Sequence, residues 1–194
     1  MAPSQRTRRV RSPLAVPKAL RAPGRARPPT EFFRLPRHWL LKSEPDVFSI
    51  DDLARAPRQT AGWDGIRNSE ARNFLRDAFA VGDLAFYYHS NAAPSAVVGI
   101  VEVVRAAYPD PTAFERGHDH FDPKSDPARP TWWMVDVKLV EKLARPVALE
   151  EIKATPALAG MALVKRGRLS VAPVTPAEWK KVLELARRPA LARR

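Results

Sequence analysis

Three apolar segments in the middle of the chain restrict the folds that it can adopt, because each has the pattern of a β-strand. Residues 83–90 (DLAFYYHS) follow a glycine turn at Gly82. Residues 95–104 (SAVVGIVEVV) are apolar on both faces, which is typical of a central strand. Residues 132–140 (WWMVDVKLV) alternate apolar and polar side chains, as a strand with one solvated face does. A sheet is therefore expected at the centre of the fold.

Helices are expected around this sheet, and most of them have clear start signals. One begins after Ser49, has two aspartates in its first turn, where the helix dipole favours negative charge, and stops at Pro57. The next begins after Asn68, a good N-cap residue, and a short helix is expected over residues 149–154. The last begins after Thr175, where the following proline and the glutamate at the third position predict a capping box.

The order of these elements predicts an α+β fold. Further strands are expected over residues 38–44 (HWLLKSE) and 170–174, so strands outnumber helices and do not alternate with them regularly. This pattern favours a mixed sheet or small β-barrel with peripheral helices over a doubly wound fold. A polar, proline-rich segment over residues 108–130 is too long for a simple hairpin and is a candidate lid.

Charge and periodicity change together between Arg37 and His38. Residues 1–37 contain ten Lys/Arg and one acidic residue, have no sustained period, and are expected to be a disordered basic extension. Residues 38–186 are nearly neutral and are expected to form one domain, and residues 187–194 form a basic C-terminal tail. The extension is interpreted either as a nucleic-acid-binding arm, as a solvated tail, or as the product of a start codon assigned too early.

Composition excludes several classes of protein. The chain has no cysteine, so it has no disulfide framework, thiol nucleophile or Cys-ligated zinc. No apolar run approaches the roughly 20 residues that span a bilayer, so no membrane partner is expected. The apolar pieces near the N-terminus are interrupted by Pro17 and Lys18, which argues against a secretory signal. We expect a cytoplasmic protein, although an arginine-rich organellar transit peptide remains an alternative.

The sequence offers no clear catalytic or metal-binding constellation. Residues 118–122 (HDHFD) lie in a proline-flanked segment with no third ligand in a fixed position, and are interpreted as a solvated polar loop rather than a metal site. His89 and Ser90 are neighbours on a strand and face opposite sides, so they cannot form a relay. Glu44 and Asp64 could form a carboxylate pair, which the sequence leaves open. No catalytic residue, metal or cofactor is therefore expected.

Among the aromatic residues, Trp63 has the most unusual sequence context. Trp133 and Trp179 stand at regular inward positions of a strand and a helix and are interpreted as core residues. Trp63 lies between Gly62 and Gly65 beside polar groups, in what reads as a loop. Its indole is as well suited to a ligand as to the core.

Six ordered segments together closely resemble the EVE domain, a member of the PUA-like group of folds. They are WLLKSEPDVFSIDDL, WDGIRNSEARNFLRD, VGDLAFYYHS, GIVEVV with AYPDPTAF, PTWWMVDVKLV and RGRLSVAPVTPAEW. The resemblance spans roughly residues 37–186. It implies a PUA-like mixed β pseudobarrel with peripheral helices, whose pocket binds a nucleobase of DNA or RNA, often a modified one. Ser69 and Glu70 depart from the family's usual residues at those positions.

The resemblance also implies a set of site residues. Trp63 would stack on a flipped base, and Arg67 would suit the adjoining phosphate. The base edge would meet polar groups supplied by Ser43, Asn68, His89 and Ser90. The remaining residues carried over from the matching motifs are Lys42, Glu44 and Asp64, with Arg168, Leu169, Ser170 and Val171 as a wall.

Three functions remain open at this point. The first is a reader of modified nucleobases. The second is an enzyme on modified nucleotides, in which Glu44 or Asp64 would act with a bound water. The third is a small-molecule sensor or interaction module on the same barrel. The sequence specifies neither the modification, nor DNA over RNA, nor an oligomeric state.

Overall fold

A computed structural model describes residues 37–188 of the chain. The expected basic extension over residues 1–37 and the tail over residues 187–194 therefore lie almost wholly outside the described residues. None of the helices between residues 37 and 188 is long and apolar enough to cross a membrane.

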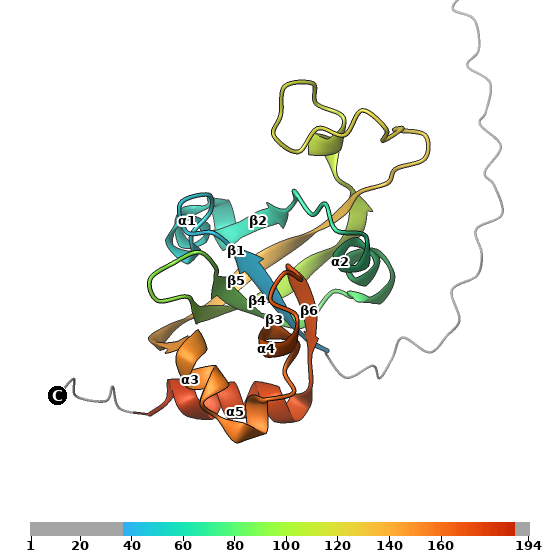
Figure 1. Cartoon of the computed structure of the whole chain (residues 1–194). Coiled ribbons are helices and arrows are strands. Elements are labelled where there is room, and N and C mark those ends of the chain that lie inside the picture. Colours follow the sequence, from blue (N-terminus) through green and yellow to red (C-terminus); the bar gives the residue numbers. More distant parts are fainter. Residues whose placement is uncertain (1–36, 189–194) are drawn as a thin grey trace, which may run out of the picture. The chain divides into compact units, whose positions relative to one another are not determined.

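One mixed sheet of six strands forms the centre of the described structure (Figure 1). Its spatial order is β2-β5-β4-β3-β1-β6. β1 and β3 run parallel, and every other neighbouring pair is antiparallel. The expected α+β class and the internal position of the doubly apolar strand β4 are both confirmed. The strands are β1 (His38–Ser43), β2 (Thr60–Trp63), β3 (Leu84–His89), β4 (Ala96–Pro109), β5 (Trp133–Ala148) and β6 (Val171–Val174).

The expected helices are present, and their caps are formed as predicted. Ser49 accepts a hydrogen bond from the backbone of Asp52, whose carboxylate accepts one in return from the Ser49 N–H. Thr175 and Glu178 form the same reciprocal box. The helices are α1 (Ile50–Arg55), α2 (Ser69–Asn73), α3 (Leu149–Lys153), α4 (Ala162–Lys165) and α5 (Pro176–Ala186). Shorter turns are η2 (Pro57–Gln59), a π-helical η3 (Phe74–Ala78), η4 (Pro111–Ala113) and η5 (Pro156–Leu158).

Two hydrophobic cores lie on opposite faces of the sheet. Because successive strand residues point to opposite faces, Leu40 and Phe86 enter one core while Leu41 and Tyr87 enter the other. The Leu40 side is covered by α5, whose Trp179 stacks on Phe86 with ring centroids 3.9 Å apart. The Leu41 side is covered by α1, α2 and η3. This second core borders the pocket described below.

The structure adds one strand that the sequence analysis did not expect and lengthens two others. Trp63 is not in a loop, because residues 60–63 form the edge strand β2 and pair with β5. β4 and β5 are 14 and 16 residues long, well beyond the segments that their apolar pattern predicts. Their extensions are more polar and more exposed, and they are held in the sheet by pairing with each other rather than by burial. Because β4 and β5 extend together, residues 110–132 form a long loop at one end of the sheet (Figure 1).

Gly99 in β4 allows α1 to lie directly on the sheet. A Cβ at this position would be 2.0 Å from Cδ1 of Ile50 and 2.6 Å from the backbone oxygen of Glu141. Ile50 is the first residue of α1 and is buried. The close approach of α1 in turn places the segment from Glu44 to Ser49, which precedes it, along the edge of the pocket.

We therefore expect Gly99→Ala to lower the free energy of unfolding by about 1–3 kcal/mol, because the new methyl group overpacks the contact with Ile50. Urea denaturation followed by tryptophan fluorescence measures the change. Gly160→Ala is the matched control, since no heavy atom lies within 4 Å of the Cβ built there. Equal midpoints for Gly99→Ala and the wild type would show that α1 does not pack this closely on β4.

Candidate functional site

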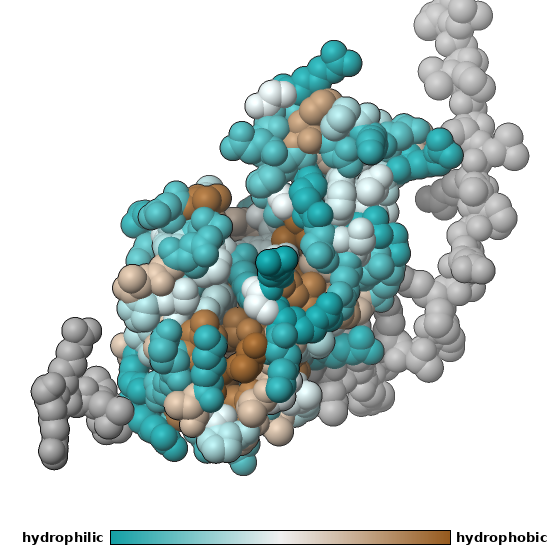
Figure 2. Space-filling view, viewed as in Figure 1, coloured by the Kyte–Doolittle hydropathy of each residue, from teal (hydrophilic) through white to brown (hydrophobic). Residues whose placement is uncertain are grey.

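A pocket of about 640 Å³ opens where the two edges of the sheet approach each other. β2 contributes one side and the residue before β6 contributes another, so the sheet must curl to bring its opposite edges to one cavity. Figure 2 shows this face hollowed near its centre, with hydrophobic side chains visible between hydrophilic ones. The pocket is lined by Lys42, Ser43, Glu44, Val47, Phe48, Ala61, Gly62, Trp63, Asp64, Gly65, Ile66, His118, Asp119, His120 and Ser170.

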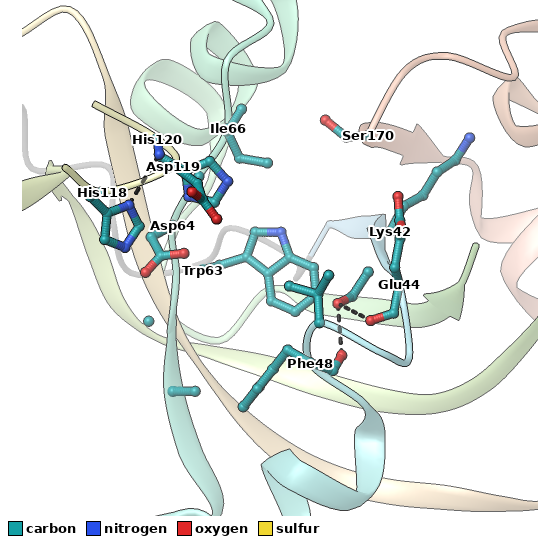
Figure 3. Close-up of a pocket in the computed structure, with 15 residues that line it drawn as sticks. Lys42, Glu44, Phe48, Trp63, Asp64, Ile66, His118, Asp119, His120 and Ser170 are labelled. Carbon is teal, nitrogen blue, oxygen red and sulfur yellow. Dashed lines mark hydrogen bonds between the residues drawn. The ribbon is translucent and has the colours of Figure 1, made fainter. Parts of the chain in front are cut away.

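Trp63 forms the floor of the pocket and belongs to the core as well (Figure 3). Its side chain is 6% exposed, and its ring meets Tyr87 edge-on with centroids 5.2 Å apart. No described residue accepts a hydrogen bond from its indole N–H, which points toward the side of the pocket between Ile66 and Ser170. Trp63 is therefore a core residue whose indole also borders the pocket.

The end of β1 forms a side of the pocket whose backbone is fixed by hydrogen bonds. The hydroxyls of Ser43 and Tyr87 each donate to the carbonyl of Phe48 at 2.7 Å. Nδ2 of Asn91 donates to the carboxylate of Glu44 at 2.7 Å. Nζ of Lys42 donates to the Gly167 carbonyl at 2.7 Å, and burial lowers the pKa of this lysine below its ordinary value. These bonds hold polar groups at the rim.

The opposite side comes from the long loop, in which His118, Asp119 and His120 line the pocket (Figure 3). The ring of His120 lies against Gly65, where a Cβ would be 2.4 Å from Cε1 of the imidazole. Gly65 also has φ +69°, so glycine is needed both for backbone conformation and for space. Nδ1 of His120 is buried with no hydrogen-bond partner among residues 37–188. The interpretation of this segment as a solvated loop therefore holds for His118 and Asp119, which are exposed, but not for His120.

Metal binding has no support in this loop. Within the part of the chain that the structure describes, no group of three or more His, Cys, Asp or Glu side chains is placed to hold a metal ion. His118 instead accepts a hydrogen bond from the backbone N–H of His120 at 3.1 Å, which shapes the turn.

A buried ion pair fixes the long loop to the start of α2. Nη1 of Arg67 donates to Oδ2 of Asp110 at 2.8 Å, and the Asp110 carboxylate is fully buried. The same guanidinium donates to the Thr112 hydroxyl at 3.1 Å, to the Ile66 carbonyl at 3.1 Å, and through Nε to the His120 carbonyl at 2.9 Å. Its Nη2 also donates to the His120 carbonyl. Arg67 thus positions the His118–His120 side of the pocket without lining it.

Asp110 completes this network from the other end. It accepts hydrogen bonds from the Gly65 N–H at 3.1 Å and from the N–H and hydroxyl of Thr112 at 2.9 and 2.7 Å. Burial alone would raise the pKa of Asp110, but the bonds from Arg67, Thr112 and Gly65 lower it below its ordinary value. Desolvation, with added repulsion from Asp110, raises the pKa of Asp64 at the pocket edge.

The structure brings six of the predicted site residues together around the pocket. They are Lys42, Ser43, Glu44, Trp63, Asp64 and Ser170.

Two further predicted residues hold the starts of helices. The Asn68 side chain accepts from the N–H groups of Glu70 and Ala71 at 3.0 Å, as an N-cap. Nε2 of His89 accepts from the N–H of Ile50 at 3.1 Å, and burial lowers the pKa of His89, which favours the neutral imidazole. Both side chains are thus already engaged by α2 and α1.

The other predicted residues lie beside the pocket. The Ser90 N–H donates to the Ser43 carbonyl at 2.9 Å, which joins the ends of β3 and β1. Val171 is buried in β6. Arg168 and Leu169 line a second, smaller cavity of about 360 Å³, together with Asn68 and residues 165–167.

Sequence reasoning missed the contribution of the long loop to the pocket. The histidines were noticed as a possible metal site, but their position against Gly65 depends on a contact between residues 55 positions apart. Asp110 was missed altogether. The available signal was the position of Asp110 before Pro111 and Thr112, which is typical of a helix N-cap. The Asp110 side chain does cap the short turn η4.

Comparison with known proteins gives one consistent result. The family model described as EVE domain matches residues 37–185. Thymocyte nuclear protein 1 of Mus musculus is 45% identical over 168 residues, covering 78% of this chain and 74% of that protein. The Homo sapiens protein of the same name is 44% identical with the same coverage.

Solved structures agree in fold. A crystal structure of human THYN1 protein in complex with 5-methylcytosine containing DNA is similar with a TM-score of 0.76 and 42% identity, covering 79% of this chain and 99% of that one. A hypothetical protein from Leishmania major has a TM-score of 0.74 and 46% identity, covering 78% and 94%. The expected PUA-like fold is thereby confirmed.

The ion pair yields a test of how the pocket is held. We expect Asp110→Asn to lower the free energy of unfolding at pH 7 by about 1.5–3 kcal/mol, because it weakens hydrogen bonds to a charged group. The pKa of Asp110 is lower in the folded state, so its contribution is complete above the unfolded pKa of about 3.9 and is lost as the pH falls through the folded value. The difference between variant and wild type should therefore be constant near neutrality and shrink below about pH 4.

Urea denaturation at a series of pH values measures this difference. Asp119→Asn is the matched control, since Asp119 lies in the same loop but is exposed. An Asp110→Asn protein as stable as that control at pH 7 would contradict the role given to the ion pair.

Proposed function

This chain belongs to the EVE domain family, and from that membership we propose that it is a DNA-binding reader whose pocket accepts one modified nucleobase, flipped out of its strand. The observation that carries the proposal is the open pocket floored by Trp63, whose indole N–H has no partner among the described residues. A relative of 42% identity has been crystallised with 5-methylcytosine containing DNA, so 5-methylcytosine is the base proposed first.

Stacking on Trp63 would supply affinity for the base. Base–aromatic stacking contributes roughly 1–3 kcal/mol per base and needs an indole that cannot turn away. The edge-on contact with Tyr87 holds the Trp63 ring in one orientation. A pre-positioned ring loses little conformational entropy when a base binds.

The base edge would be read by polar groups already held at the rim. Ser43, Ser170 and the carboxylate of Glu44 line the pocket, and the indole N–H adds a donor on the same side as Ser170. Donors and acceptors are thus both within reach of an aminopyrimidine edge. Asn68 and His89 are assigned no direct base contact here, because each already caps a helix.

A base inside a duplex could not enter such a pocket, so extrusion is part of the proposal. Unpairing and unstacking cost a few kcal/mol, and the cost is smallest for single strands and mismatches. We therefore propose that unpaired targets bind more tightly than paired ones.

The central test replaces the floor of the pocket. We expect Trp63→Ala to weaken binding of a single-stranded oligonucleotide containing one 5-methylcytosine by about 1–3 kcal/mol, and to bring the ratio of its affinity to that for the cytosine oligonucleotide toward one. Fluorescence anisotropy measures both affinities. Mass spectrometry of the recovered oligonucleotide shows whether it has been altered, as an enzyme would require.

Because Trp63 is also a core residue, Ser170→Tyr provides a second route to the same result. This side chain should fill the pocket without removing a core contact, so the preference should be lost while the urea midpoint is unchanged. Trp63→Phe is the conservative control and should keep part of the preference. A folded Trp63→Ala protein with undiminished preference for the methylated base would contradict the pocket assignment.

A further inference from the structure

Arg67 has no hydrogen-bond donor left for a phosphate. A guanidinium has five N–H groups. In this structure Nε donates to the His120 carbonyl, Nη1 to Ile66 and Asp110, and Nη2 to Thr112 and His120. All five are therefore committed within the protein. A base held in the pocket still carries a charged backbone, so a different group must meet its phosphate.

Basic side chains gather beside the pocket, around the turn that follows α4. This turn, which we call the basic cradle, comprises residues 165–168 and lines the cavity of about 360 Å³. Lys165 and Arg168 are exposed, and neither side chain has an ion-pair or hydrogen-bond partner among residues 37–188. Arg166 differs, because it is paired with Glu70. Two uncommitted cations thus border one cavity.

The cradle is joined to the pocket by Lys42. This residue lines the pocket, and its Nζ donates to the carbonyl of Gly167 in the cradle. Ser170, two residues after Arg168, lines the pocket as well. The two cavities therefore share a border, and Figure 3 places Lys42 and Ser170 on the same side of the Trp63 ring.

The opposite side of the pocket would repel a phosphate. Asp64 and Asp119 line it there, and Figure 3 shows both on the far side of Trp63 from Lys42. On the cradle side the lining carboxylate of Glu44 is accompanied by Lys42 and by Lys165 and Arg168 of the cradle, so the balance of charge is acidic beside the long loop and basic beside the cradle. A strand that enters the pocket has its lowest electrostatic energy when its backbone lies over the cradle.

We propose that the basic cradle is a phosphate-binding site, in which Lys165 and Arg168 hold the phosphodiester that adjoins the base in the pocket. This proposal rests on the proposed function and extends it, because it assigns base binding and phosphate binding to two neighbouring cavities. The pocket discriminates between bases. The cradle supplies affinity that does not depend on the nucleotide sequence. Arg67 shapes the pocket through its hydrogen bonds to the long loop.

The test uses the full chain carrying Lys165→Ala and Arg168→Ala together, with binding of single-stranded oligonucleotides measured over a series of salt concentrations. Loss of charge-assisted hydrogen bonds should weaken binding about tenfold at low salt. Loss of one neutralised phosphate should reduce the slope of log K against log salt by about 0.7. The ratio of affinities for 5-methylcytosine and cytosine should stay as in the wild type.

The matched control removes the same number of positive charges at two exposed lysines outside the cradle. Lys153→Ala with Lys180→Ala changes exposed residues of α3 and α5. This variant should bind like the wild type. An equal loss in both double variants would overturn the proposal, since it would reflect net charge alone.

A chemical variant of the DNA locates the contact. Replacing the phosphate on either side of the modified base by an uncharged methylphosphonate should weaken binding to the wild type at one of the two positions. The same replacement should have no further effect on the Lys165→Ala/Arg168→Ala protein. If the loss of affinity from the methylphosphonate and the loss from the two substitutions were additive, the proposal that the cradle binds this phosphate would be overturned.

The two proposals fail separately in this design. A wild-type protein that binds methylated and unmethylated strands equally would overturn the modified-base reader, while the cradle would still be judged from the salt slope on either strand. A normal preference with an unchanged slope in the double variant would overturn the cradle alone.

Discussion

The buried ion pair between Arg67 and Asp110 is the interaction on which the pocket depends. It joins the segment that carries Trp63 and Gly65 to a loop that begins more than 40 residues later, and Gly65 and His120 hydrogen-bond to the two partners directly. A buried carboxylate is costly unless it is fully hydrogen-bonded, and Asp110 has four such bonds. The Arg67–Asp110 pair is thus structural, and recognition falls to the residues that line the pocket.

The pocket lies where the sheet closes its core and where a ligand could enter. The sheet curls so that β2 and the residue before β6 border one cavity, and Trp63 closes the core at that place while the small exposed part of its surface borders the cavity. A side chain held by the core is rigid, which suits it to stacking. The same curl brings the turn after α4 to the rim, so a base pocket and a basic cavity share a border at Lys42.

Features that depend on residues close together in the sequence could be predicted, whereas features that depend on distant residues could not. The caps at Ser49, Asn68 and Thr175 depend on residues two or three positions away, and all three formed as expected. The fold class followed from strand periodicity and from the family resemblance. The strand β2 was missed because residues 60–63 are few, contain a glycine, and are held by pairing with β5. The roles of Arg67 and His120 depend on contacts across more than 40 residues, which no local pattern reports.

If a modified base lies against Trp63 inside the pocket, nuclear magnetic resonance can observe the contact directly. A single-stranded oligonucleotide carrying one ¹³C-labelled methyl group on 5-methylcytosine would be titrated with the full chain. Insertion predicts an upfield ring-current shift of the methyl resonance and nuclear Overhauser contacts from it to the indole protons of Trp63. A complex that forms with the same affinity, but leaves the methyl shift unchanged and shows no contact to Trp63, would contradict the account.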